Sequence, residues 1–179
     1  MEIDEEPAKG NSNKISKLKS AFEKDGTITA ANASSINDGA AALVLMSNEK
    51  AIELDIQPIC KIISQTSVAQ EPIYFTTAPG KAINKILKKS SLSINDIDLF
   101  EINEAFSNVA LAAMREHKIP HEKVNVHGGA VSLGHPIGAS GARILITLIS
   151  ALKQRNQKRG LATLCIGGGE AAAVIIEMI

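Results

Sequence analysis

Three short stretches of the sequence place reactive residue types beside a flexible backbone. The first is Asn-Glu-Ala-Phe at 103–106, the second is the glycine-rich run 128–143, and the third is Cys165 with the glycines at 167–169. Glycines let a backbone approach a ligand closely, so each stretch is a candidate ligand loop. The glycine-rich run matches neither GxGxxG nor GxxxxGK[ST], which argues against a nucleotide phosphate site.

An asparagine and a histidine are the polar candidates in the first two stretches. Asn103 stands where we expect a strand to end and a helix to begin. It could cap that helix, the more usual role, or hold a water or an oxyanion. His135 precedes Pro136, which suits a first helical position. A helix amino terminus disfavours imidazolium, so we expect a neutral His135 that can accept a proton; a histidine that only packs or caps is the alternative.

The two cysteines differ in their surroundings. Cys165 closes an apolar run before Gly167, whose backbone N–H group could stabilise an oxyanion or a thiolate; a small buried hydrophobe is the alternative. Cys60 lies in an apolar run without glycines, which predicts a buried hydrophobe. No CxxC pair and no His/Cys cluster has zinc spacing, and we expect a reducing compartment.

The elements that must position these residues alternate between strand and helix. Helical periodicity predicts helices at 48–54, 79–89, 104–117 and 136–152. Apolar runs predict five strands, at 41–46, 60–68, 97–102, 161–166 and 171–178. This order predicts an α/β fold in which the last two strands, joined by the glycine turn, are antiparallel.

Charge and composition exclude several classes of function. Lysine plus arginine equals aspartate plus glutamate, at 19 each, so no net charge favours nucleic acid or an anionic membrane surface. No apolar stretch approaches the roughly 20 residues of a membrane span. The acidic start resembles neither a signal peptide nor a mitochondrial transit peptide. We therefore expect no nucleic-acid or membrane partner.

Taken together, the motifs resemble those of the thiolase family. The matching segments are Asn-Glu-Ala-Phe at 103–106, the run from Gly128 to Arg143 and Cys-Ile-Gly-Gly-Gly at 165–169, with further matches at 26–34 and 37–41. Within the family, the segments 29–34, 71–73, 103–107 and 151–154 look most like the mitochondrial acetoacetyl-CoA thiolases. The resemblance runs from about residue 14 to the end of the chain.

The resemblance implies a thiolase-like layered fold and a catalytic set. The fold would be one carboxyl-terminal half-domain, with a five-stranded mixed sheet and helices on both faces. His135 matches the histidine that takes a proton from the nucleophilic cysteine, and Cys165 matches the cysteine that exchanges a proton with the α-carbon of acetyl-CoA. Asn103 matches the asparagine whose water forms an oxyanion hole with His135, and the N–H of Gly167 matches a donor of the second oxyanion hole.

The resemblance also implies binding sites for CoA and for K⁺. Ser34 matches a residue that contacts the pantetheine of CoA. The residues that would line the CoA and acyl tunnel are Phe22, Ile36, Phe75 and Phe106. Backbone carbonyls would bind K⁺ at Ala30, Ala31, Ala33 and Val131. CoA and acetyl-CoA are then substrates, and no redox cofactor is expected.

The same resemblance implies an acetyl-CoA C-acetyltransferase that joins or cleaves acetyl units as thioesters. Residues 1–36 would be a remnant of the CoA-binding loop region, and residues 37–179 the thiolase C-terminal domain. The nucleophilic cysteine of the family has no match here, so we expect the chain alone to be inactive and to need an N-terminal thiolase half or other subunits. The alternative is a non-catalytic thiolase that associates with intact subunits. We expect the mitochondrial matrix, with the cytoplasm as the alternative.

Overall fold

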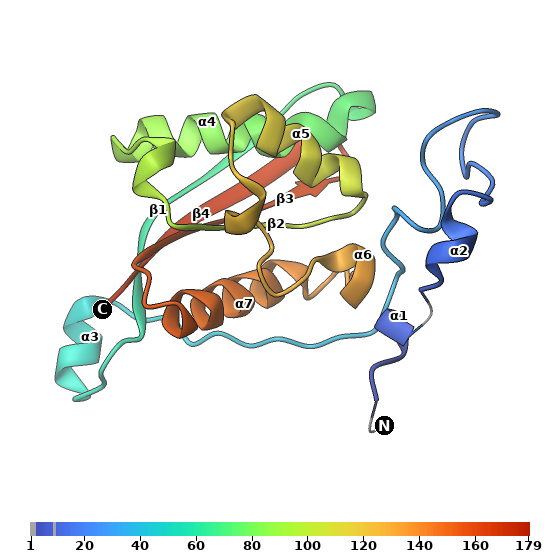
Figure 1. The fold of residues 1–179 in the computed structure, drawn as a ribbon. Helices are drawn as coiled ribbons and strands as arrows, with labels where there is room; N and C mark the ends of the chain where they lie inside the picture. Colours follow the sequence, from blue (N-terminus) through green and yellow to red (C-terminus); the bar gives the residue numbers. More distant parts are fainter. Residues whose placement is uncertain (1–2, 9) are drawn as a thin grey trace.

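A computed structural model describes residues 3–8 and 10–179 and contains one mixed sheet (Figure 1). The strands are β1 (Cys60–Ala69), β2 (Leu99–Ile102), β3 (Arg159–Ile166) and β4 (Glu170–Met178), in the order β1-β4-β3-β2. β4 is antiparallel to both β1 and β3, whereas β3 and β2 are parallel. The predicted α/β class and the antiparallel final pair are therefore confirmed.

Helices α4 (Ala78–Ser90) and α5 (Ser107–His117) cover one face of the sheet (Figure 1). Their apolar side chains share a core with alternate residues of β2, β3 and β4. This core includes Ile83 and Val109 from the helices, and Phe100, Leu161 and Ile175 from the strands. Each helix ends at a residue with positive φ, Ser91 in one and Lys118 in the other, as is common at helix carboxyl termini.

Helix α7 (Ser140–Gln154) covers the opposite face. Ile144, Leu148 and Leu152 pack on Leu99, Ala162 and Ile176, which alternate with the residues of the first core. Gly160 of β3 allows this close approach, because a Cβ there would lie 2.6 Å from Leu148 Cδ1. The prediction of helices on both faces of the sheet is thus confirmed.

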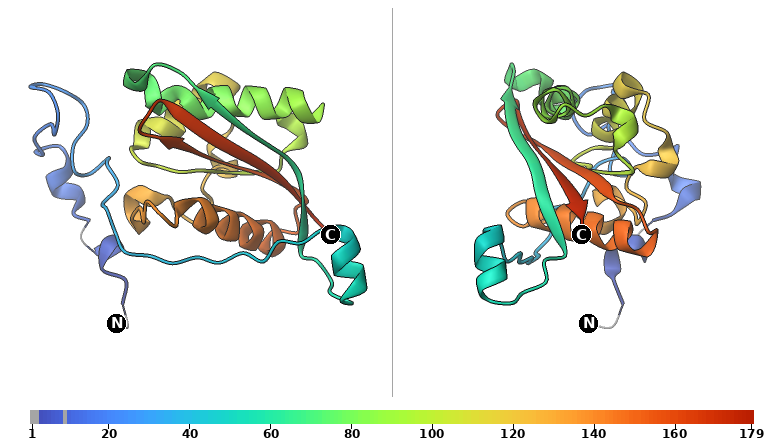
Figure 2. Two further views of the ribbon diagram at one scale, coloured as in Figure 1. Left: turned by 180° about the vertical axis from the view of Figure 1, so that it is seen from behind. Right: turned by 90° about the vertical axis from the view of Figure 1, so that its left-hand side faces the viewer.

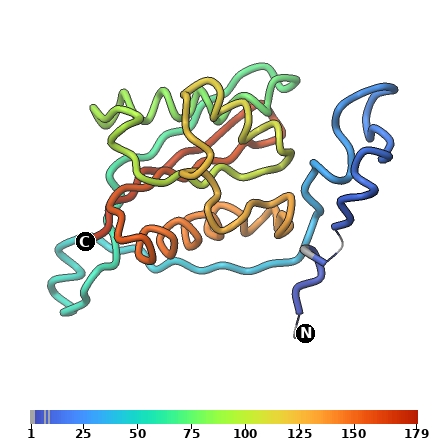
Figure 3. Tube along the Cα trace, viewed as in Figure 1, coloured from blue at the N-terminus to red at the C-terminus, as the bar shows by residue number. Residues whose placement is uncertain are grey.

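The remaining elements are short. They are α1 (Glu5–Ala8), α2 (Ser12–Ile15), α3 (Asn48–Glu53), α6 (Ala130–Leu133) and three 3₁₀ helices, η1 (Pro72–Thr77), η2 (Ile94–Asp96) and η3 (His121–Lys123). Between residues 37 and 46 the chain is extended and runs along α7 toward α3, as the tube in Figure 3 and the rear view in Figure 2 show.

The predicted strand at 41–46 is wrong, and the sheet has four strands instead of five. These residues are extended, but a strand needs a neighbouring backbone, and this segment is not part of the sheet within the described residues. Its side chains are correspondingly open, with Val44 87% and Leu45 67% exposed. At the far edge of the sheet Val124 forms a single bridge with Phe100.

Two helices begin later than their periodicity predicted. α5 begins at Ser107 instead of 104, and α7 at Ser140 instead of 136. In both places the preceding residues form irregular loops whose side chains make tertiary hydrogen bonds. None of the described helices has the length and apolar character needed to cross a membrane.

Candidate active site

Asn103 directly follows β2 and faces α7. Strand alternation places Glu101 and Asn103 on the same side of the sheet, opposite Ile102. The Asn103 backbone N–H extends the parallel ladder by donating to Thr163 O at 3.0 Å, and the residue is 1% exposed. Because α5 begins four residues later, the helix-cap interpretation of Asn103 is wrong.

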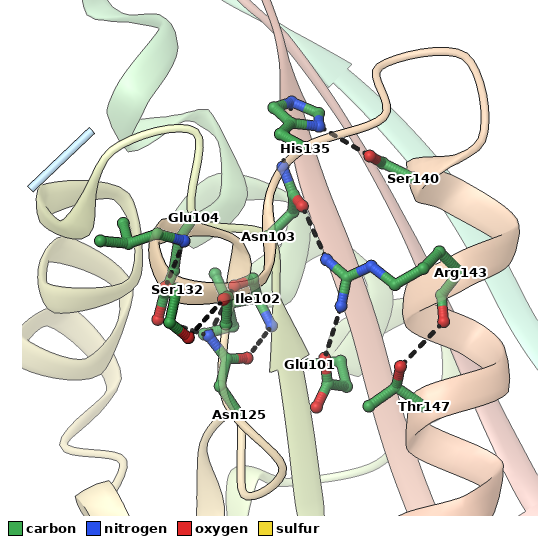
Figure 4. Close-up of polar contacts among 12 residues, drawn as sticks. Glu101, Ile102, Asn103, Glu104, Asn125, Ser132, His135, Ser140, Arg143 and Thr147 are labelled. Atoms are coloured by element: carbon green, nitrogen blue, oxygen red, sulfur yellow. Dashed lines mark hydrogen bonds and ion pairs between the residues drawn. The ribbon is translucent and has the colours of Figure 1, made fainter. Parts of the chain in front are cut away.

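The Asn103 side chain connects a histidine with an arginine (Figure 4). Its Nδ2 lies 3.3 Å from His135 Nε2, and its Oδ1 accepts a hydrogen bond from Arg143 Nη2 at 3.1 Å. Arg143 comes from the first turn of α7, and His135 from the loop that precedes this helix. The structure therefore brings together Asn103 and His135, which are 32 residues apart in sequence.

The backbone of His135 is fixed by the segment near residue 36. His135 N–H lies 2.9 Å from Ser35 O and 3.2 Å from Asn37 Oδ1, and Ile36 forms an isolated bridge with His135. Gly134 has φ +89°, and a Cβ there would overlap the Asn37 amide. Ile36 itself is 82% exposed, so its side chain is free to contact a ligand beside His135.

Ser140 fixes the tautomer of His135. The Ser140 hydroxyl donates to Pro136 O at 2.9 Å, so its oxygen accepts the 2.6 Å hydrogen bond from His135 Nδ1. The proton of the neutral ring is then on Nδ1, and Nε2 presents a lone pair. Partial burial and, secondly, the charge of Arg143 lower the pKa of His135, which agrees with the expected neutral ring although the main cause is burial.

Behind Asn103 lies a buried acid. Glu101 is 2% exposed, and its Oε2 lies 3.7 Å from Arg143 Nη1. Burial raises the pKa of Glu101 to about 8, against the opposing effect of Arg143. The sequence motifs did not single out Glu101 or Arg143, although a glutamate in an otherwise apolar strand is itself a signal of a buried, partnered charge.

Glu104 and Asn125 hold the glycine loop against the end of β2. Glu104 accepts hydrogen bonds from Val131 N at 3.2 Å and Asn125 Nδ2 at 2.9 Å, and its carboxylate fills the place of a Cβ at Gly129. Asn125 also pairs with the backbone N–H and C=O of Ile102, so it completes the free edge of β2. These contacts support the loop instead of facing a ligand.

Cys165 lies at the other face of the sheet, in the core beneath α4 and α5. Burial raises the pKa of its thiol, so the expectation that the glycine turn favours a thiolate is wrong for the described chain. Gly167 is exposed, with open space where a Cβ would be. No hydrogen bond joins Cys165 to Asn103 or His135 in the part of the chain that the structure describes.

Three of the predicted tunnel residues form an aromatic cluster. Phe106 is in edge-to-face contact with Phe22 at 5.7 Å and with Phe75 at 6.2 Å between ring centroids. Phe75 and Phe106 pack against the core that contains Cys165. Ser34 donates from both its N–H and its hydroxyl to Ala105 O, which places it beside Phe106.

The four residues predicted to bind K⁺ come from two segments. Ala30 and Ala31 lie in a turn that Thr29 and Asn32 close, and Ala33 bridges Phe106. Val131 lies in α6, where its N–H donates to Glu104. Ala33 and Val131 thus both contact the Asn103–Phe106 loop, Ala33 at Phe106 and Val131 at Glu104.

Comparison with known proteins identifies two family domains. Residues 56–178 match the thiolase C-terminal domain, and residues 1–49 match the thiolase N-terminal domain. The chain is 53% identical to acetyl-CoA acetyltransferase 2 of Arabidopsis thaliana over 180 aligned residues, which cover 100% of the chain and 45% of that protein. A probable acetyl-CoA acetyltransferase of Dictyostelium discoideum is 49% identical, over 98% of the chain and 42% of that protein.

Solved structures agree with these matches. An acetyl-CoA acetyltransferase of Bacillus anthracis superposes with a TM-score of 0.94 at 48% identity, over 98% of the chain and 45% of that structure. The Acat5 thiolase of Ascaris suum, solved with coenzyme A, gives 0.90 at 46% identity, over 98% of the chain and 46% of that structure. The chain thus spans somewhat less than half the length of the proteins that it matches.

Proposed function

Because the chain belongs to the thiolase family, we propose that it supplies the carboxyl-terminal part of an acetyl-CoA C-acetyltransferase active site. The observation that carries the proposal is the hydrogen-bonded series Arg143–Asn103–His135–Ser140, which leaves His135 Nε2 unprotonated and able to accept a proton. The reaction would join two acetyl units in acetyl-CoA or cleave acetoacetyl-CoA with a second CoA.

His135 acts first as a base and then as a donor. Nε2 takes the proton of the nucleophilic thiol while the sulfur attacks the acyl carbon of the substrate. The same Nε2–H, together with a water held by Asn103 Nδ2, then donates to the negatively charged acyl oxygen. When the tetrahedral intermediate collapses and the C–S bond to CoA breaks, His135 returns the proton to the CoA thiolate.

Cys165 exchanges a proton with the α-carbon of acetyl-CoA. In cleavage, the nucleophilic sulfur adds to the keto carbon of the acetoacetyl group, the C–C bond breaks with the acetyl group left on that sulfur, and the Cys165 thiol protonates the departing enolate. In condensation, the Cys165 thiolate removes that proton, and the carbanion attacks the acetyl carbon and displaces the nucleophilic sulfur. The raised pKa of Cys165 supports a resting thiol, which is the form that cleavage requires. The N–H of Gly167 is a hydrogen-bond donor of the second oxyanion hole.

The nucleophile must come from outside these 179 residues, since Cys60 lies at the start of β1 and Cys165 has its own role. We propose that a cysteine-bearing N-terminal thiolase segment completes the site, on the same polypeptide or on another. The division into a loop-region remnant at 1–36 and a C-terminal domain at 37–179 stays part of the proposal, as does the mitochondrial matrix as the compartment.

Ser34, Ile36 and the Phe22–Phe75–Phe106 cluster would hold the pantetheine and acyl group of CoA. Potassium belongs to the same proposal. The carbonyl oxygens of Ala30, Ala31, Ala33 and Val131 would hold the ion, and hard oxygen donors of this kind suit an alkali cation. The ion would stiffen the loops beside Phe106 and take no part in the bond changes.

A non-catalytic thiolase subunit is the second candidate. The exposed side chains of Val44, Leu45 and Ile52 favour it, because apolar surface of this kind marks a protein interface. On this alternative the chain would dock onto intact thiolase subunits without turning over substrate.

Thiolysis of acetoacetyl-CoA tests the proposal. The purified chain is assayed alone and mixed with a separately expressed thiolase N-terminal half. We expect activity only in the mixture, with a loss of at least about 1,000-fold for His135→Ala and for Cys165→Ala. The matched controls His121→Ala and Cys60→Ala should keep full activity, since neither residue lies at the site. A folded chain that stays inactive in the mixture would favour the non-catalytic subunit.

A further inference from the structure

The Asn103 amide must take one of two orientations that have nearly the same shape. With Nδ2 toward His135, its Oδ1 accepts from Arg143 Nη2 at 3.1 Å. In the flipped orientation, amide N–H groups would face the guanidinium N–H groups, and Oδ1 would face the lone pair of His135 Nε2. Both contacts of the flipped amide would be repulsive. The donor on Arg143 therefore selects the orientation of Asn103.

We propose that Arg143 is a positioning residue whose guanidinium locks the Asn103 amide toward His135. The inference rests on the proposed function in one respect: it affects the rate only if Asn103 and His135 form the oxyanion pair. The contacts of Asn103 with Arg143 and with His135 lie within this chain and can be tested without catalysis.

The setting of Arg143 argues for a role other than stability. The guanidinium is enclosed between α7 and β2, and its Nε and Nη1 atoms have no hydrogen-bond partner among the described residues. Its ion-pair partner Glu101 lies 3.7 Å away, longer than a hydrogen bond. A buried cation with few partners lowers the free energy of unfolding, and an apolar residue of similar size would be less destabilising. The hydrogen bond to Asn103 is what an apolar residue could not supply.

The charged groups around Arg143 come from three places. Glu101 points to it from β2, Glu104 acts on it from the loop after β2, and His135 lies before α7. Arg143 lowers the pKa of His135, because a nearby cation disfavours imidazolium. Loss of the cation should therefore raise the pKa of His135 and move the acidic limb of any rate profile to higher pH.

Nuclear magnetic resonance on the ¹⁵N-labelled chain tests the structural part. Arg143→Met removes donor and charge, Arg143→Lys keeps a cationic donor, and Arg115→Met on the exposed side of α5 is the control. We expect Arg143→Met to abolish the Overhauser contact between the Asn103 amide protons and the His135 ring and to raise the His135 titration midpoint. Arg143→Lys should retain the low midpoint and part of the contact.

Kinetics of the chain mixed with the N-terminal half test the catalytic part. Arg143→Met should lower kcat about 100-fold with KM nearly unchanged, because a misdirected Asn103 stabilises the transition state poorly while CoA still binds. Arg143→Lys should recover at least about 10-fold of that loss. Arg115→Met should match the unaltered chain in both experiments.

The outcomes separate this inference from the proposed function. An Arg143→Met chain that is folded by circular dichroism and keeps both the contact and the His135 midpoint overturns the inference. If the contact is lost while every mixture is inactive, the positioning role stands and the proposed activity fails. If Arg143→Met does not fold, Arg143→Lys decides: a weakened contact together with a kcat up to about 10-fold below that of the unaltered chain supports the role, and loss of the contact with unchanged kcat overturns it.

Discussion

The two candidate catalytic regions of this chain differ in how completely they are built. Around Asn103 and His135, hydrogen bonds from β2, α7 and the loop before α7 fix the amide orientation and the imidazole tautomer. Around Cys165 and Gly167, the thiol is buried and Gly167 faces open space. The residues of the first region are joined by hydrogen bonds within this chain, whereas no hydrogen bond among the described residues joins the second region to the first.

This difference shows what each region would contribute under the proposed function. His135 would be a base that must be oriented before the substrate arrives, and Asn103 and Ser140 already orient its ring. Cys165 would need to ionise only when an acyl group and an oxyanion donor lie beside it. The open turn at Gly167 is consistent with that donor set being shared with another segment.

The largest effect should come from Glu101, the buried acid behind Asn103. The pKa of Glu101 is about 8 in the folded chain against a usual 4.5, so between these values the folded state binds a proton that the unfolded state lacks. Stability is therefore lost as the pH rises, by about 3 kcal/mol between pH 5.5 and 8.5. Urea unfolding should show this loss in the unaltered chain and not in Glu101→Gln. The prediction is contradicted if the free energy of unfolding depends on pH equally in the unaltered chain and in Glu101→Gln. The exposed control Glu122→Gln should show the pH dependence of the unaltered chain.

The glycine turn offers a matched pair of substitutions. Gly169 has φ +90°, and a Cβ there would overlap the carbonyl oxygen of Gln70, so Gly169→Ala should lower the free energy of unfolding by about 2 kcal/mol. Gly167→Ala meets nothing within 4 Å and should change it by less than about 0.5 kcal/mol. Thermal or urea unfolding measures both. Similar losses at the two positions would show that the turn is less open than the structure indicates.

The tautomer of His135 should depend on Ser140. Ser140→Ala leaves the Nδ1–H of the half-buried His135 without its acceptor, at a cost of about 1.5 kcal/mol, and allows the proton to move to Nε2. Nitrogen chemical shifts of His135 report the tautomer, and urea unfolding reports the cost. Ser150→Ala, farther along α7, is the control and should change neither. An unaltered Nδ1–H tautomer in Ser140→Ala would contradict the claim that Ser140 fixes the tautomer of His135.

The smallest effect should appear at Cys165. Because burial raises the pKa of its thiol, alkylation by iodoacetamide at pH 7.5 in a Cys60→Ala background should be about 10-fold slower than that of N-acetylcysteine. The rate should climb as the pH approaches the raised pKa. A rate equal to or faster than that of the small thiol would mean that the turn stabilises a thiolate, and the contrast between the two regions would disappear.

The sequence alone predicted most of the fold because its signals are local. The apolar runs of β1, β3 and β4 and the periodicity of α4 identified these elements and the antiparallel final pair. The run at 41–46 has the same composition as a strand, yet pairing depends on a second backbone at the right place. Composition carries no information about that backbone, so the fifth strand was wrong.

The site divides in the same way. Motifs at fixed spacing determined which residues could act, among them Asn103, His135 and Cys165. Only the tertiary structure decided how they act: Asn103 is no helix cap, Ser140 sets the imidazole tautomer, and Glu101 and Arg143 meet behind the amide. Hydrogen-bond direction and burial arise where distant segments are packed together, and a residue's type and its neighbours in sequence do not fix either one.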